Sequence, residues 1–119
     1  MWKIEFYKTV NGAVPAEDFL DSIEIVKLKA KMIRELDLLE EFGNQLREPH
    51  TKLVVDDRAS LFELRAQQSS NISRIFFFFR EGKKIILLNG IVKKQDKTPP
   101  EAIDLAYSYK KDYEKRNLK

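Results

Sequence analysis

The sequence of 119 residues contains no cysteine, and this absence excludes disulfides, thiolate metal centres and thiol redox chemistry. It also has no apolar run near the ~18 residues that a transmembrane helix needs. The opening residues, Met1 to Glu5, mix acid and base and do not resemble a signal peptide. No repeat, low-complexity tract or linker interrupts the chain. We therefore expect a cytoplasmic protein that makes no contact with a membrane.

Residues typical of metal and cofactor sites are also scarce. His50 is the single histidine, and Asp56 and Asp57 have no cysteine, histidine or third spaced carboxylate beside them. There is no glycine-rich phosphate loop, dinucleotide fingerprint or Ser-His-Asp set. We expect neither a metal nor a cofactor.

The length and the hydrophobic content of the chain suit one folded domain. At this length there is room for a single compact domain, which we place at residues 1–119. Hydrophobic residues make up 43% of the chain and aromatic residues 11%, enough to fill a core and to argue against disorder.

The net charge of +3 hides an asymmetry along the chain. Residues 1–60 hold 9 Lys and Arg against 12 Asp and Glu, a balance of −3. Residues 61–96 hold 7 against 3, giving +4, and residues 97–119 hold 6 against 4, giving +2. A chain that binds a polyanion concentrates positive charge in this way, although a similar excess also serves solubility.

Hydrophobic periodicity predicts the order of the elements. Proline at position 15 suits the start of a helix, and Gly43 suits the end of the next one. Thr98 to Glu101 fits a capping box, with Pro100 at the first helical position of a last helix of about four turns. The lack of Gly or Pro at residues 25–29 leaves open whether the first two helices are continuous. We expect strands at residues 2–7, 53–55, 61–66, 72–80 and 84–92, and helices from residue 15, at residues 32–42 and after residue 99.

Two of these strands are apolar on both faces. Residues 75–79 read IFFFF and residues 85–88 read IILL, so both strands must be central and covered on both sides. Tight turns join the last strands, which makes the sheet mainly antiparallel. The fold class is therefore α+β, with N-terminal helices packed on the sheet and a C-terminal helix.

Three segments in the second half of the chain carry a recognisable pattern: residues 61–65 (LFELR), 74–78 (RIFFF) and 87–99 (LLNGIVKKQDKTP). In this order they resemble the RelE/ParE toxin superfamily, and its phage-derived, HigB-like branch in particular. The resemblance covers residues 61–101 well, whereas the helical first half matches in layout alone. It implies a fold like that of microbial ribonucleases and, in most members, metal-independent cleavage of mRNA on the ribosome, by attack of a ribose 2′-hydroxyl on the adjacent phosphate. It also implies a cognate antitoxin, often a helix-turn-helix protein of the HigA type, held with the toxin in a hetero-oligomer.

The residues themselves can support such chemistry, which needs a proton acceptor, a proton donor and cations around the phosphate. Arginine binds phosphate through two parallel hydrogen bonds, and a crowded lysine can lose its proton. We predict Arg65, Arg74, Lys94 and Lys93 as catalytic residues, with Lys94 preferred over Lys93 because alternation points the two to opposite faces. The alternatives are structural: Arg65 pairs with Glu63, and Arg74 caps a buried strand. We also expect loss of either arginine to leave the fold intact, as for an exposed strand charge.

Further cations and two other side chains complete the candidate site. We predict that Lys97, Lys84 and Arg80 bind RNA. His50 and Tyr109 are possible catalytic groups; the alternatives are an ordinary loop histidine and a core tyrosine. The chain departs from RelE, which carries lysines where Phe62 and Glu63 stand here and a tyrosine at about the position of Pro100.

The favoured function is thus a toxin that acts as a ribosome-dependent mRNA endoribonuclease, with an antitoxin, the ribosome and mRNA as partners. Two alternatives stay open. One is a ParE-like inhibitor of DNA gyrase, and the other is a catalytically inactive module of the same fold that binds RNA or protein.

Overall fold

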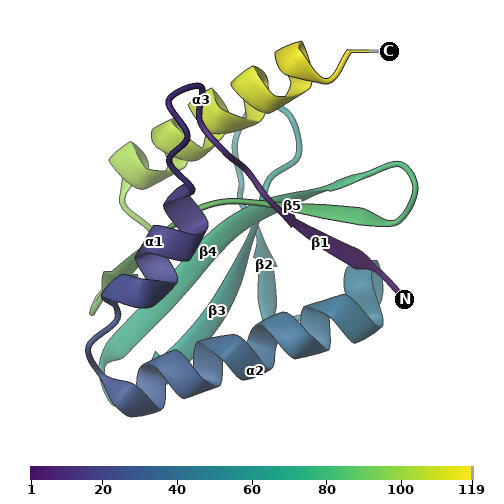
Figure 1. The fold of residues 1–119 in the computed structure, drawn as a ribbon. Coiled ribbons are helices and arrows are strands. Elements are labelled where there is room, and N and C mark those ends of the chain that lie inside the picture. Colours follow the sequence, from purple (N-terminus) through teal and green to yellow (C-terminus); the bar gives the residue numbers. More distant parts are fainter. Residues whose placement is uncertain (119) are drawn as a thin grey trace.

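The structure, a computed structural model, describes residues 1–118 and consists of one five-stranded sheet with helices on both faces (Figure 1). The helices are α1 (Pro15–Ser22), α2 (Val26–Phe42), the short 3₁₀ helix η1 (Gly43–Gln45) and α3 (Pro100–Arg116). The strands are β1 (Lys3–Phe6), β2 (Thr51–Leu53), β3 (Phe62–Gln68), β4 (Asn71–Arg80) and β5 (Lys84–Lys93). This arrangement confirms the α+β class expected from the sequence.

The sheet has the order β1-β5-β4-β3-β2, so the two all-apolar strands lie inside it as predicted. Strands β2 to β5 are antiparallel to their neighbours, and β1 alone is parallel to β5. The parallel pairing is possible because α1 and α2 carry the chain across one face between β1 and the rest of the sheet.

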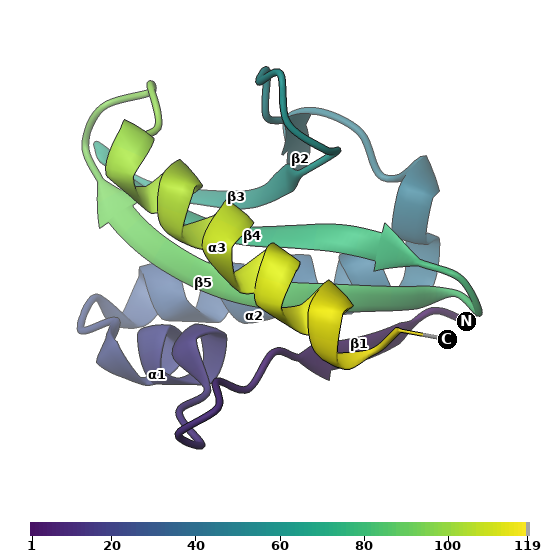
Figure 2. The same ribbon diagram turned by 90° about the horizontal axis from the view of Figure 1, so that it is seen from above.

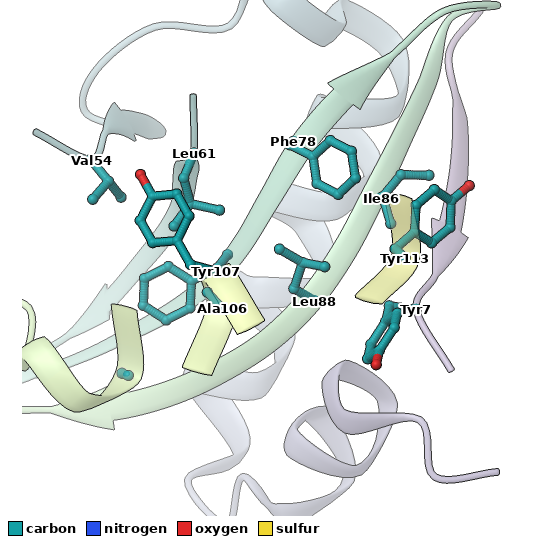
Figure 3. Close-up of a cluster of buried hydrophobic side chains, with 11 residues drawn as sticks. Tyr7, Val54, Leu61, Phe78, Ile86, Leu88, Ala106, Tyr107 and Tyr113 are labelled. Carbon is teal, nitrogen blue, oxygen red and sulfur yellow. The ribbon is translucent and has the colours of Figure 1, made fainter. Parts of the chain in front are cut away.

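The helices α1 and α2 cover one face of the sheet and α3 the other (Figure 2), and each face has its own core. On one face, Leu28, Met32 and Leu39 of α2 pack with Leu64 and Phe77 of the sheet. On the other face, α3 lies across β4 and β5. There Ala106, Tyr107 and Tyr113 of α3 meet sheet residues that include Leu61, Phe78, Ile86 and Leu88 (Figure 3).

An irregularity in the pairing of β4 with β5 lies between Ile75 and Phe77. Ile75 pairs with Gly90 and Phe77 with Leu87, so β5 has one extra residue there. A Cβ on residue 90 would stand 2.3 Å from the ring of Phe19. Because Gly90 has no side chain, α1 can lie against the strand.

Two local predictions are wrong, and both errors have a tertiary cause. The second strand is Thr51–Leu53 and not residues 53–55, because its partner β3 begins at Phe62 and leaves Val55 nothing to pair with. The proposed capping box does not form, since α3 has Pro99 as its N-cap with no side-chain cap. The hydroxyl of Thr98 instead donates a 2.7 Å hydrogen bond to Glu63.

The helices α1 and α2 are separate. Ile23 is buried and has an extended backbone, with ψ of 112°, so the chain turns there without Gly or Pro. Within residues 1–118, no helix has the combination of length and apolar character needed to cross a membrane.

Candidate functional site

Arg65 and Arg74 face each other across β3 and β4, where they are direct register partners. Like charges placed opposite each other destabilise a sheet unless an anion compensates them. Glu63, one pleat away from Arg65 on β3, provides that anion. Its Oε1 lies 3.1 Å from Nε of Arg65 and 3.7 Å from Nε of Arg74.

The two arginines also hold the loop between β5 and α3, residues 94–99. Arg74 donates to the backbone carbonyls of Gln95 and Asp96, the latter at 2.8 Å. Arg65 donates to the same Asp96 carbonyl at 2.8 Å and to the Asp96 carboxylate at 3.2 Å. Since Thr98 also bonds Glu63, the loop is fixed to the sheet at three of its residues, 95, 96 and 98.

The two arginines differ in access. Arg74 has no exposed surface, and burial, together with the nearby charge of Arg65, lowers its pKa. Arg65 keeps 15% of its side chain exposed. The sequence-based expectation treated both as exposed strand charges, and for Arg74 the burial contradicts that premise. In this structure its guanidinium faces protein atoms only.

Arg65 opens onto a cleft of about 570 Å³, which we call the basic cleft. Its walls come from α2, from residues 48–52 and from the ends of β3 and β4, and Asp96 closes one side. The charged and titratable residues that line it are Lys31, Arg34, Glu35, Glu48, His50, Lys52, Arg65 and Asp96.

His50 lies in this cleft with its orientation set by α2. Nδ1 of His50 is 2.7 Å from Oε1 of Glu35, while the backbone N–H of Arg65 donates to the His50 carbonyl at 2.8 Å. A neutral imidazole whose Nδ1–H bonds a carboxylate keeps Nε2 free to accept a proton. The His50 side chain is 39% exposed, so a ligand in the cleft can reach it.

The lysines predicted from the sequence lie near the same end of the sheet. Lys93 is the last residue of β5, and Lys94 and Lys97 stand on the loop that Arg65 and Arg74 hold. All three are exposed. The structure thus brings Arg65, His50 and the loop lysines to one end of the molecule.

Three other predicted residues are not brought there. Arg80 and Lys84 pair with each other at the opposite end of the β4–β5 hairpin. Arg80 is six positions after Arg74, about 20 Å along the strand. Arg80 instead donates to the hydroxyl of Tyr113 at 3.1 Å. Tyr109 packs on Tyr7 with ring centroids 4.8 Å apart, nine residues or about 14 Å along α3 from its start.

Sequence reasoning missed Glu35, Arg34 and Lys31. They are spaced i, i+3, i+4 and so share one face of α2, a pattern that could have marked a polar stripe facing the sheet end. The pairing of Arg65 with Glu63, given above as the structural alternative, is present. Sequence reasoning missed the burial of Glu63 and its contact with Arg74.

Asp56 serves a structural contact. Its carboxylate bonds the guanidinium of Arg58 at 2.7 Å, and this contact holds the Asp56 pKa well below its ordinary value. Among residues 1–118, no cluster of three or more His, Cys, Asp or Glu side chains is placed to hold a metal ion.

A model of the family described as "Phage derived protein Gp49-like (DUF891)" matches residues 18–111. The match begins within α1, ends within α3 and includes every residue of the basic cleft. Among curated proteins, none matches the sequence closely enough to count as a relative.

Proposed function

The chain belongs to the phage-derived Gp49-like family, whose members are similar to RelE-type toxins, and we propose that it is the toxin of a toxin–antitoxin pair and cleaves RNA in the basic cleft. The observation that carries this proposal is the meeting of His50 and Arg65 in one cleft, with Glu35 orienting the imidazole. A proton acceptor beside a permanent cation is the minimum that RNA cleavage by its own 2′-hydroxyl requires.

In the proposed reaction Nε2 of His50 accepts the proton of the ribose 2′-hydroxyl, and the 2′-oxygen attacks the adjacent phosphorus. The bond from phosphorus to the 5′-oxygen breaks, leaving a 2′,3′-cyclic phosphate and a 5′-hydroxyl. Arg65 binds the phosphate as its negative charge grows. We assign the proton taken up by the leaving 5′-oxygen to Lys94 on the adjoining loop.

We assign Arg74 a positioning role. Its hydrogen bonds fix residues 95 and 96, and through them the loop that carries Lys94 and Lys97. A side chain with no exposed surface acts on RNA through such neighbours.

For the substrate and partners we propose mRNA on the ribosome and an antitoxin of the helix-turn-helix type. This follows from the resemblance of residues 61–101 to the HigB-like branch and from the family membership. Since every role above belongs to a side chain, cleavage of mRNA on ribosomes is expected to need no metal beyond the magnesium that the ribosomes themselves require.

The test is induction of the protein alone, with growth, translation and mRNA ends measured together. Wild type is expected to stop growth and translation and to leave cut messages. His50→Asn and Arg65→Gln should each lower cleavage by about 10²- to 10³-fold. Lys27→Gln, an exposed cation at the start of α2, is the matched control and should act as wild type. Thermal melts confirm that each variant is folded.

Other outcomes separate the alternatives. If translation continues while DNA supercoiling collapses, the protein is a gyrase inhibitor. If RNA is bound but stays intact both in isolation and on ribosomes, the protein is an inactive binding module. Folded His50 and Arg65 variants that still stop growth would remove these two residues from the site.

A further inference from the structure

A second cleft, of about 530 Å³, has a floor of phenylalanine rings. Phe62, Phe77 and Phe79 of β3 and β4 form the floor of this phenylalanine cleft, and Asn44, Arg47 and Glu48 stand at its edge. It shares Glu48 and Thr51 with the basic cleft, so the two are neighbours along the segment between η1 and β2.

The rings of the floor support one another. Phe62 stacks on Phe77 with centroids 5.6 Å apart and planes 21° from parallel, and Phe79 meets both edge-on. Phe77 is fully buried, whereas Phe62 and Phe79 are half-buried and offer surface to the cleft. Rings held in this way present a preformed aromatic surface to a flat ligand.

The edge of the cleft is polar. Asn44, Arg47 and Glu48 are all exposed, and together they offer amide, guanidinium and carboxylate groups. These groups are the ones that pair with the hydrogen-bonding edges of bases: Asn with adenine, Arg with guanine and Glu with cytosine. Leu46 and the exposed Leu53 complete the lining. An aromatic floor beneath such a polar edge suits a flat ring with polar sides.

We propose that the phenylalanine cleft binds one unstacked base of single-stranded RNA whose backbone passes round the sheet edge at Glu48 and Thr51 to the phosphate held by Arg65. The inference rests on the proposed function and names a base subsite for it. Arg65 stands three positions after Phe62 on β3, about 10 Å along the strand, so the two side chains leave opposite faces of the sheet. The two clefts meet at the sheet edge, where both are lined by Glu48 and Thr51. Sequence-tolerant binding of single strands commonly combines a cationic groove with aromatic stacking of this kind.

The experiment uses two oligonucleotides of equal length that lack 2′-hydroxyls and so cannot be cut. One carries adenine at every position, and the other is abasic with the same number of phosphates. Binding of each to the full-length protein is measured by fluorescence anisotropy at fixed salt. The variants are Phe62→Leu, Phe62→Trp, Arg65→Gln and Phe42→Leu, the last an exposed phenylalanine outside both clefts.

Wild type is expected to bind the adenine strand about 5- to 100-fold more tightly than the abasic one. Phe62→Leu should abolish most of that ratio, while Phe62→Trp and Phe42→Leu should keep it. Arg65→Gln should weaken binding of both strands by a similar factor and leave the ratio of the two affinities unchanged.

The failures are distinguishable. Equal binding of both strands, with Arg65→Gln still weakening them, overturns the base subsite and leaves the proposed function standing. If Phe62→Leu weakens binding of the adenine strand and Arg65→Gln does not weaken binding of either strand, the phosphate site is overturned. If Phe62→Leu leaves RNA binding unchanged and weakens the antitoxin complex, the cleft is a protein contact. Absence of binding to either strand counts against both proposals.

Discussion

At the scale of the residue, the burial of Arg74 gives it a different role from that of Arg65, its partner across the sheet. A charge with no access to water must find its partners inside the protein, and Arg74 finds three carbonyls, at Ile72, Gln95 and Asp96, with Glu63 nearby. Arg65 has an opening to the basic cleft. Both arginines therefore hold the loop, and Arg65 alone also reaches the cleft.

Removal of Arg74 should destabilise the protein far more than removal of Arg65. Arg74→Met leaves the carbonyls of Ile72 and Gln95 without this donor, and leaves the Asp96 carbonyl and buried Glu63 with Arg65 alone of the two arginines. Removal of one partner from a buried charged group typically costs about 3–5 kcal/mol. Arg65→Met should cost less, because water reaches its position. Urea denaturation of both variants gives the comparison, and Glu63→Met combined with Arg74→Met should recover part of the loss. Equal stability of Arg74→Met and wild type would contradict the positioning role.

The sequence predicts part of this site and hides the rest. The spacing of residues 65 and 74 around a tight turn already places the arginines on neighbouring strands, and the register makes them partners. Which of them is buried depends on residues 94–99 folding back, and that contact is between segments more than 20 positions apart. The pairing of His50 with Glu35, 15 positions away, is equally non-local, so His50 alone looked like a loop residue.

At the scale of the element, strongly patterned segments were predictable and their junctions were not. The central strands and the helix after Pro100 follow from apolar runs and from proline at the first helical position. The strand β2 is short and depends on its partner, so its position could not be fixed by its own residues. The hydroxyl of Thr98 could cap α3 locally, but it instead makes a long-range hydrogen bond to Glu63.

The end of β1 is tied to α3 by a buried tyrosine. The hydroxyl of Tyr7 donates a 2.6 Å hydrogen bond to Asp112, and Arg116 bonds the same carboxylate at 2.7 Å and the carbonyl of Lys8. Burial, reinforced by the hydrogen bond to Asp112, raises the pKa of Tyr7 to about 12.

This pKa predicts a loss of stability at alkaline pH. An unfolded tyrosine loses its proton near pH 10, well below the pKa of Tyr7 in the folded chain, so between these values the folded state binds more protons. The contribution of Tyr7 is therefore complete below about pH 10 and is lost as the pH rises towards about 12. Urea midpoints measured at about pH 8, 10 and 11.5 should fall for wild type, with a shallower fall for Tyr7→Phe. Parallel curves for the two proteins would mean that other groups control the alkaline transition.

At the scale of the whole molecule, the two ends of the sheet carry cations in different settings. At one end Lys94 and Lys97 stand on the loop beside Arg65. At the other end Lys83 lies over the ring of Trp2, 6.0 Å from its centroid, and Lys84 begins β5. The fold thus separates charges that the sequence joins in one basic segment, and the proposed site needs the first group alone.

Reversal of charge at each end tests this separation. Lys94→Glu with Lys97→Glu and Lys83→Glu with Lys84→Glu each change the formal net charge by −4, from +3 to −1. If RNA binds at the basic cleft, the loop pair should weaken binding of a single strand and flatten its dependence on salt. The slope of log affinity against log salt should fall by about 0.7 for each phosphate that the variant no longer neutralises. The pair at the far end should keep most of the affinity and the slope, because a surface charge more than a Debye length of about 10 Å from the strand is largely screened. The measurement is a salt titration of binding for both double variants beside wild type. If the two variants bind with equally reduced affinity, binding follows net charge, and the lysines of both ends belong to one diffuse surface rather than to a site.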